Sequence, residues 1–166
     1  LAALERAGYP LEALEREIIS DINERLDGSG YPRGVTKEAL SPVARMAAVI
    51  DVIDAMTRSR GDRPALGAVE AYRYLYNRPA RFDHHWVTRY VQRHGFYPLG
   101  CLVRFSHGYL AWVLALDERG QPCRVRVVRN TRREGIFYDD DINRVDFDQL
   151  GRLVESVQPE RYGLTP

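Results

Sequence analysis

The chain has 166 residues, 45% of them hydrophobic and 28% charged, which fits one globular domain or a domain with a small appendage. Its 24 Lys and Arg residues nearly balance 23 Asp and Glu residues, so the net charge of +1 gives no global signal for nucleic acid or an anionic membrane. No apolar run approaches the ~18–20 residues of a membrane span, and the two cysteines, Cys101 and Cys123, are too few for a disulfide framework or a zinc site. We expect free thiols, a cytoplasmic location, and no contact with nucleic acid or membrane.

Helical patterns fill the chain up to about Gly95. Apolar residues three and four positions apart give amphipathic faces, and Ser41-Pro42 is typical of an N-cap followed by proline at the first helical position. Three glycines and a proline within residues 27–34 interrupt the pattern and predict a loop. We expect helices over residues 1–4, 11–26, 42–57, 68–76 and 83–93. Because the chain opens on Leu1, inside a helical pattern, we expect a fragment of a longer protein.

Beyond Pro98 the pattern becomes that of strands, rich in β-branched, aromatic and apolar residues and separated by turn sequences. We expect strands over residues 99–106, 109–117 and 123–129, a short fourth strand over 135–138, and one more helix over 148–157. A strand region of this size needs further support, so we expect it to pack on the helical part. The predicted fold class is α+β, with a helical domain over residues 1–95 and a small antiparallel β-rich extension over residues 96–166.

A basic run follows the third expected strand. It consists of Arg124, Arg126, Arg129, Arg132 and Arg133. Three aspartates at positions 139, 140 and 141 come soon after, so we expect charge balance within the chain rather than a surface for nucleic acid.

Two carboxylates mark the helix expected over residues 42–57. With 3.6 residues per turn of an α-helix, Asp51 and Asp54 share one line with several alanines and Arg58, and the apolar stripe lies opposite. A carboxylate on such a face must be solvated, paired or bound to a cation. A solvated outer face with an Asp54–Arg58 pair is one interpretation.

The loop before this helix favours a functional interpretation. Gly28 and Gly30 leave backbone N–H groups free to approach a phosphate, and Asp27 could orient a ligand or bind one. Most glycine loops are simply turns, so the loop is informative only together with the sequence that surrounds it.

That surrounding sequence resembles a known family. The run Asn-Glu-Arg-Leu-Asp-Gly-Ser-Gly-Tyr-Pro at residues 23–32 resembles the His-His-Glu-x-x-Asp-Gly-Ser-Gly-Tyr-Pro hallmark of HD-GYP domains. The similarity continues through Ala-Arg-Met at 44–46, Asp-Val-Ile-Asp-Ala-Met-Thr at 51–57, Phe-Asp at 82–83 and the β-rich tail, which is roughly the whole chain. The resemblance implies an N-terminally truncated HD-type helical bundle in the first 95 residues.

The resemblance also implies a chemistry. HD-GYP domains hold two or three metal ions, usually iron or manganese, and hydrolyse cyclic-di-GMP with a metal-bound hydroxide. It implies a metal ligand at Asp51, contacts with the ligand phosphate at Arg60 and Arg63, and Asp54 near the same pocket. It further implies a docking surface for diguanylate-cyclase (GGDEF-type) partners in the signature loop, which includes Asp27, Gly28, Gly30, Tyr31 and Pro32.

Two departures from the family pattern weaken the metal site. Ile22 and Asn23 replace the paired histidines; isoleucine has no donor atom, and asparagine offers only a neutral amide oxygen. Residues 1–26 contain no histidine, so Asp51 and Glu24 alone are left of the usual ligands. We therefore expect a degenerate site with no catalytic residue and no cofactor in this chain, and iron or manganese only if the full-length site is active.

These observations predict a signalling or regulatory module that binds cyclic-di-GMP through Arg60 and Arg63 or docks a partner through the signature loop. One alternative is an active metal-dependent cyclic-di-GMP phosphodiesterase whose remaining ligands lie upstream of Leu1. A second alternative is a structural or dimerising remnant of the family.

Overall fold

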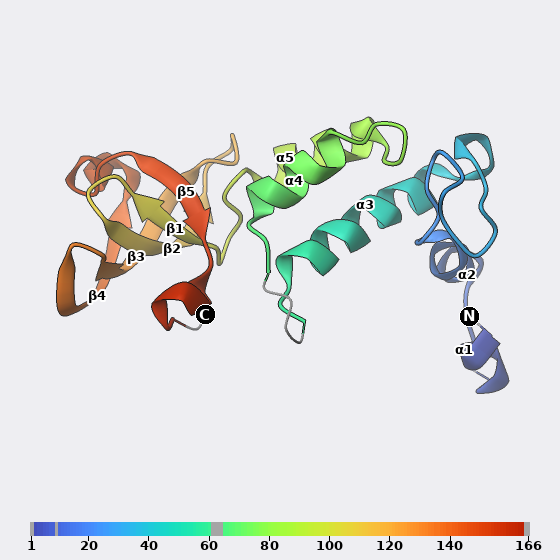
Figure 1. Ribbon diagram of the computed structural model, residues 1–166, viewed down its shortest axis with the longest axis horizontal. Coiled ribbons are helices and arrows are strands. Elements are labelled where there is room, and N and C mark those ends of the chain that lie inside the picture. The colour runs from blue at the N-terminus through green and yellow to red at the C-terminus, as the bar shows by residue number, and fades with distance from the viewer. Residues whose placement is uncertain (1, 9, 61–64, 165–166) are drawn as a thin grey trace. The chain divides into compact units, whose positions relative to one another are not determined.

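The computed structural model describes residues 2–8, 10–60 and 65–164 (Figure 1). The chain divides into two compact units. We call residues 1–56 with 71–89 the helical unit, and residues 57–70 with 90–166 the sheet unit. None of the described helices is long and apolar enough to cross a membrane.

The helical part of the chain begins with short elements and contains one long helix. The helices are α1 (Ala2–Arg6), α2 (Ala13–Asp21), α3 (Pro42–Thr57), α4 (Ala68–Tyr76) and α5 (His84–His94), with a 3-10 turn η1 (Lys37–Ala39) before α3. The Ser41 hydroxyl accepts the backbone N–H of Ala44 at 3.1 Å, which caps α3 as its sequence predicts. Arg45 on α3 pairs with Asp83 at 3.0 Å, and Asp83 also accepts the N–H of His85 to cap α5.

The helices expected over residues 42–57, 68–76 and 83–93 are confirmed, but the helix expected over residues 11–26 is wrong in its length. α2 ends at Asp21, where Glu24 N–H donates to the Asp21 carbonyl in a tighter turn, and Leu26 N–H donates to the Arg81 carbonyl. Residues 22–26 thus leave the helix despite their helical spacing, and the acceptor of Leu26 comes from a distant segment.

The sheet unit is an antiparallel sheet with strand order β4-β3-β2-β1-β5 (Figure 1). Its elements are β1 (Leu102–Phe105), β2 (Tyr109–Leu116), β3 (Pro122–Asn130), β4 (Arg133–Asn143), the 3-10 turn η2 (Arg144–Gln149), β5 (Leu153–Val157) and the 3-10 turn η3 (Pro159–Tyr162). The α+β fold class is confirmed, and the fourth strand is longer than expected. The division into domains at residue 95 stays a prediction.

The helix expected over residues 148–157 is wrong. η2 ends at Gln149, and the following residues form β5, which pairs with β1 in the register Leu102 with Val157 and Phe105 with Leu153. The apolar spacing is compatible with a helix, but β1 would otherwise leave one side of its backbone unpaired, and this pairing satisfies those groups.

The core of the sheet unit is aliphatic and is closed by aromatic residues. Val103, Val113 and Val125 are fully buried between neighbouring strands, and Phe147 from η2 meets buried Phe105 edge-on at 5.4 Å. Both cysteines are free thiols, as expected, and burial raises the pKa of the Cys101 thiol to about 12.

The expected charge balance of the basic run is confirmed for Arg126. The β3–β4 pairing places its guanidinium 2.7 Å from Asp141 and 3.4 Å from Asp139. Both pairs are exposed to solvent, so they neutralise the strand surface rather than stabilise the fold appreciably.

The end of α5 gives a test of packing in the sheet unit. Gly95 has φ +70°, and a Cβ there would lie 2.1 Å from the Gly120 carbonyl oxygen. We predict that Gly95→Ala lowers the free energy of unfolding by about 3–5 kcal/mol, because a backbone clash adds to the left-handed strain. Gly100→Ala is the control, since Gly100 has φ +76° but nothing within 4 Å, and should cost only about 1–2 kcal/mol. Equal losses in urea denaturation would contradict the clash.

Candidate functional site

The signature loop, residues 22–36, connects the turn after α2 to η1 and closes on itself. Asp27 and Thr36 form an isolated antiparallel bridge, and Lys37 N–H donates to the Leu26 carbonyl at 3.0 Å. Asp27 is exposed, and its carboxylate accepts the Ser29 N–H at 2.9 Å. Hydrogen bonds from Ser29, first from its side chain and then from its backbone, lower the pKa of Asp27. Asp27 therefore shapes the loop.

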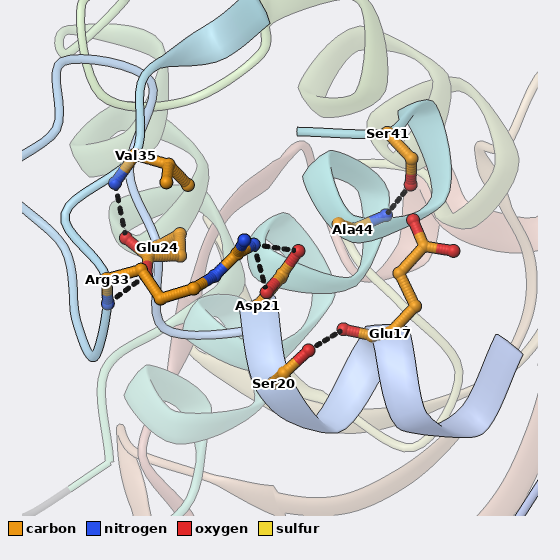
Figure 2. A network of polar contacts seen from close by, with 8 residues as sticks. All are labelled: Glu17, Ser20, Asp21, Glu24, Arg33, Val35, Ser41 and Ala44. Atoms are coloured by element: carbon orange, nitrogen blue, oxygen red, sulfur yellow. Dashed lines mark hydrogen bonds and ion pairs between the residues drawn. The ribbon is translucent and has the colours of Figure 1, made fainter. Parts of the chain in front are cut away.

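The carboxylate of Glu24 holds the loop from inside (Figure 2). Glu24 is only 1% exposed; one of its oxygens accepts the N–H of Arg33 at 2.7 Å, and the other accepts the N–H of Val35 at 3.3 Å. A buried carboxylate is tolerated where such donors satisfy it. Each oxygen of Glu24, the second candidate ligand, thus accepts one hydrogen bond from the loop backbone.

A second buried carboxylate reinforces the first. Asp21, at the end of α2, is 5% exposed, and both its oxygens lie 2.8 Å from Nη2 of Arg33 (Figure 2). This ion pair ties α2 to the far side of the loop. The sequence prediction missed the Asp21–Arg33 pair. Asp21 lies seven positions after Leu14, on the apolar face of α2, and an acidic side chain at such a position was a usable signal.

Gly30 lets the loop fold back on the turn after α2. A Cβ at Gly30 would lie 2.4 Å from the Glu24 Cα and 2.6 Å from the Asn23 carbonyl oxygen, and Tyr31 N–H donates to that oxygen at 3.3 Å. The prediction that Gly28 keeps its N–H free for a phosphate is wrong, because this N–H donates to the Arg25 carbonyl at 2.9 Å. The glycines serve the packing of the loop on itself.

The outer part of the loop faces solvent. Tyr31 is 63% exposed, and Pro32 and Arg33 are exposed beside it. The predicted docking residues at the tip are therefore accessible on a backbone that buried carboxylates hold in place.

The carboxylates of α3 do not lie on a solvated outer face. Ala44 and Ala48 lie on the same face of α3 as Asp51 and Asp54. The two alanines are buried, at 1% and 7% exposure, and the two aspartates are half-buried. The interpretation of the face with Asp51 and Asp54 as a solvated outer face is therefore wrong. Val49, Ile53 and Met56 of the opposite stripe are buried as well, so α3 packs on both sides.

The remaining predicted positions are distributed over both units. Ile22 and Asn23 lie half-buried in the turn after α2. Arg60 is exposed, directly after α3, and belongs to the sheet unit; Arg63 lies outside the described residues. Within residues 2–8, 10–60 and 65–164, no three His, Cys, Asp or Glu side chains are grouped to hold a metal ion. The residues around the loop supply few side-chain donors for a multinuclear centre, because position 22 has no donor atom and position 23 offers only an amide.

The sequence prediction passed over two arginines: Arg25, within the loop, and Arg81, whose carbonyl accepts the N–H of Leu26. Arg25 donates Nη1 to the carbonyls of Ile22 and Glu24 and lies over the Phe82 ring at 5.2 Å. Burial lowers the pKa of Arg25, the positive charge of Arg81 lowers it further, and Asp51 acts in the opposite direction. Arg25, Arg81 and Asp51 are therefore close enough for their charges to interact.

Comparison with known proteins identifies the helical part. The family model of the HD domain matches residues 7–85. A cyclic di-GMP phosphodiesterase of Pseudomonas aeruginosa is 39% identical over 104 residues, which are 63% of this chain and 25% of that protein. A cyclic di-GMP phosphodiesterase response regulator of Xanthomonas campestris pv. campestris is 45% identical over 62 residues, 37% of this chain and 16% of that protein. A 3'3'-cGAMP-specific phosphodiesterase of Vibrio cholerae is 44% identical over 48 residues, 29% of this chain and 11% of that protein.

The helices and the signature loop thus define a domain of the HD class. More particularly, the matched part of the chain is an HD-GYP-type domain, similar to part of the cyclic di-GMP phosphodiesterases named above. The chain spans a quarter or less of the length of these relatives.

The role of Glu24 as the anchor of the loop can be tested by removing its charge. We predict that Glu24→Gln lowers the free energy of unfolding by about 2–3 kcal/mol, because the new amide directs an N–H at the N–H of Arg33 or Val35. Glu38→Gln is the matched control, since Glu38 is exposed and its carboxylate accepts the Thr36 hydroxyl at the surface, and it should leave the urea midpoint nearly unchanged. If Glu24→Gln is as stable as the natural chain, Glu24 does not anchor the loop.

Proposed function

We propose that this chain is a cyclic-di-GMP signalling domain that binds its ligand or docks a partner without hydrolysing the ligand. The observation that supports this most is the donor set beside the signature loop. Ile22 and Asn23 occupy the positions of the family's paired histidines, and each oxygen of the neighbouring Glu24 carboxylate already accepts one N–H, from Arg33 and from Val35. Asp51 is left as one half-buried carboxylate, which does not hold two metal ions by itself.

The preserved loop supports a binding or docking role. Tyr31 and Pro32 are exposed at its tip, while Glu24 and Asp21 fix its base from the interior. A surface that is ordered before its partner arrives loses less conformational entropy on association. A diguanylate-cyclase domain of the GGDEF type is the partner that we propose for this surface, and Arg60, Arg63 and Asp54 are the proposed contacts of the dinucleotide.

An active phosphodiesterase is the second candidate. The names of the relatives favour it, since the matched proteins of Pseudomonas and Xanthomonas are called phosphodiesterases. It requires iron or manganese and ligands from residues upstream of Leu1. A structural or dimerising remnant is the third candidate, and the absence of any dinucleotide binding would favour it.

Metal content and turnover separate the first two candidates. We predict that the full-length protein, purified without chelator, contains well below one iron or manganese ion per chain by elemental analysis. We also predict no hydrolysis of cyclic-di-GMP after Mn²⁺ or Fe²⁺ is added, because the side chains of residues 22 and 23 cannot complete the set of metal ligands. An authentic cyclic-di-GMP phosphodiesterase serves as the positive control. Robust turnover by this protein would overturn the proposal in favour of the enzyme.

Ligand binding separates the signalling domain from the remnant. We predict that the chain binds cyclic-di-GMP in calorimetric titration and that changing Arg60 and Arg63 together to Ala weakens binding by at least about tenfold, through the loss of charge-assisted hydrogen bonds to phosphate. Arg119→Ala, an exposed arginine in the turn between β2 and β3, is the control and should not change the affinity. Titration with 3'3'-cGAMP tests the choice of dinucleotide. No binding of either dinucleotide would favour the remnant.

A further inference from the structure

The signature loop contains the one Asp-Gly pair of the sequence, at residues 27 and 28, and the sequence has no Asn-Gly pair. An aspartate rearranges in water most readily when glycine follows it, because glycine has no side chain to hinder its own backbone nitrogen. Asp27 is exposed, so water reaches its carboxyl group. The pair therefore brings to the loop a reactivity that ligand binding and docking do not use.

The rearrangement needs only the chain and water. The backbone nitrogen of Gly28 attacks Cγ of Asp27, a C–N bond forms, and the OH of the carboxyl group leaves with the proton of the nitrogen as water. A second water then opens the cyclic imide at one of its two carbonyl carbons. Opening at Cγ restores Asp27, whereas opening at the main-chain carbonyl carbon gives isoaspartate, whose backbone is longer by one methylene.

The closed loop holds both reacting groups on other partners. Gly28 N–H donates to the Arg25 carbonyl at 2.9 Å, so the proton that must leave is bound. One carboxylate oxygen of Asp27 accepts the Ser29 N–H at 2.9 Å, which directs the side chain to Ser29. The bridge between Asp27 and Thr36 fixes the backbone that carries the two groups. The attack therefore requires the loop to open.

The fold also explains why the reactive pair is present. Gly28 has φ +75°, and a Cβ there would lie 3.1 Å from the Gly34 carbonyl oxygen, so both the conformation and the space disfavour a side chain. Asp27 supplies the acceptor for the Ser29 N–H. Each residue serves the closed loop, and their adjacency creates the reactive pair.

We propose that Asp27–Gly28 is a site of spontaneous isoaspartate formation and that closure of the signature loop suppresses the reaction. Closure depends on Glu24, which binds the N–H groups of Arg33 and Val35; Val35 directly precedes Thr36, the bridge partner of Asp27. The buried carboxylate thus holds the segment opposite the reactive pair. Local opening of this loop sets the rate of the reaction. The chemistry belongs to the loop and does not rest on the proposed function.

The test follows isoaspartate in the full chain at neutral pH and physiological temperature. Trypsin releases residues 26–33 as one peptide, since Arg25 and Arg33 provide the cleavage sites, and chromatography separates its aspartate and isoaspartate forms of equal mass. We expect the folded chain to form isoaspartate at least about tenfold more slowly than the same chain unfolded in urea, because only the open fraction of the folded chain reacts. In the unfolded chain, Gly28→Ala should slow the reaction, because its Cβ hinders the attacking nitrogen.

Glu24→Gln tests the link to loop closure. In the folded state, we expect it to form isoaspartate at least about threefold faster than the natural chain, because the anchor of the loop is weakened. Glu38→Gln is the matched control and should react at the natural rate, since Glu38 is exposed and its carboxylate accepts the Thr36 hydroxyl at the surface. If Glu24→Gln does not fold, urea below the unfolding transition of the natural chain should produce the same acceleration.

The outcomes separate the reactive site from its protection. Absence of isoaspartate at residue 27 in the unfolded chain would overturn the site itself. Equal rates in the folded and unfolded natural chain would overturn the protection by the loop. Equal rates for folded Glu24→Gln and Glu38→Gln would overturn the dependence on the Glu24 anchor. No outcome involves a cyclic dinucleotide, so a failure of the proposed function leaves this test unaffected.

Discussion

The buried carboxylate of Glu24 is the interaction on which the signature loop depends. A charge that is 1% exposed is stable only while hydrogen-bond donors surround it, and the donors here are the backbone N–H groups of Arg33 and Val35. The chain must therefore return to Glu24 nine and eleven residues later. The other contacts of the loop follow from this return, because it places the Arg33 side chain opposite Asp21 and presses Gly30 against the turn at residues 23–25.

A loop closed in this way divides its residues into two groups. Glu24, Gly30 and the backbone of Arg33 are committed to the interior, whereas Tyr31 and Pro32 point to solvent and contribute nothing to closure among the described contacts except through the Tyr31 N–H. The exposed side chains are thus held on a backbone whose geometry they do not determine. This separation suits a surface that recognises a partner, since its side chains can be specific without affecting the stability of the loop.

Local sequence signals were sufficient where an element is determined by its own residues. The boundaries of α3 were predicted because a proline at the first position and a serine cap act within one turn, and those of α4 from its apolar spacing. The errors occurred where contacts with a distant segment determine the secondary structure. Leu26 lies outside the helix expected for it, with its N–H on the Arg81 carbonyl, and residues 153–157 form a strand because β1 lies beside them. Arg81 itself was missed because a single arginine in a connection becomes notable only when its neighbours in space are known.

The hydrogen bonds that residues 22 and 23 make to the loop come from their backbone carbonyls. Ile22 contributes its carbonyl to Arg25, and Asn23 contributes its carbonyl to the Tyr31 N–H; both contacts come from the backbone and are open to any side chain. On the proposed function, the loss of metal donors concerns the side chains of residues 22 and 23, whereas these hydrogen bonds come from their backbone. The proposed recognition surface concerns the exposed side chains of Tyr31 and Pro32. The two proposals therefore involve different atoms of the same segment, from Asp21 to Thr36.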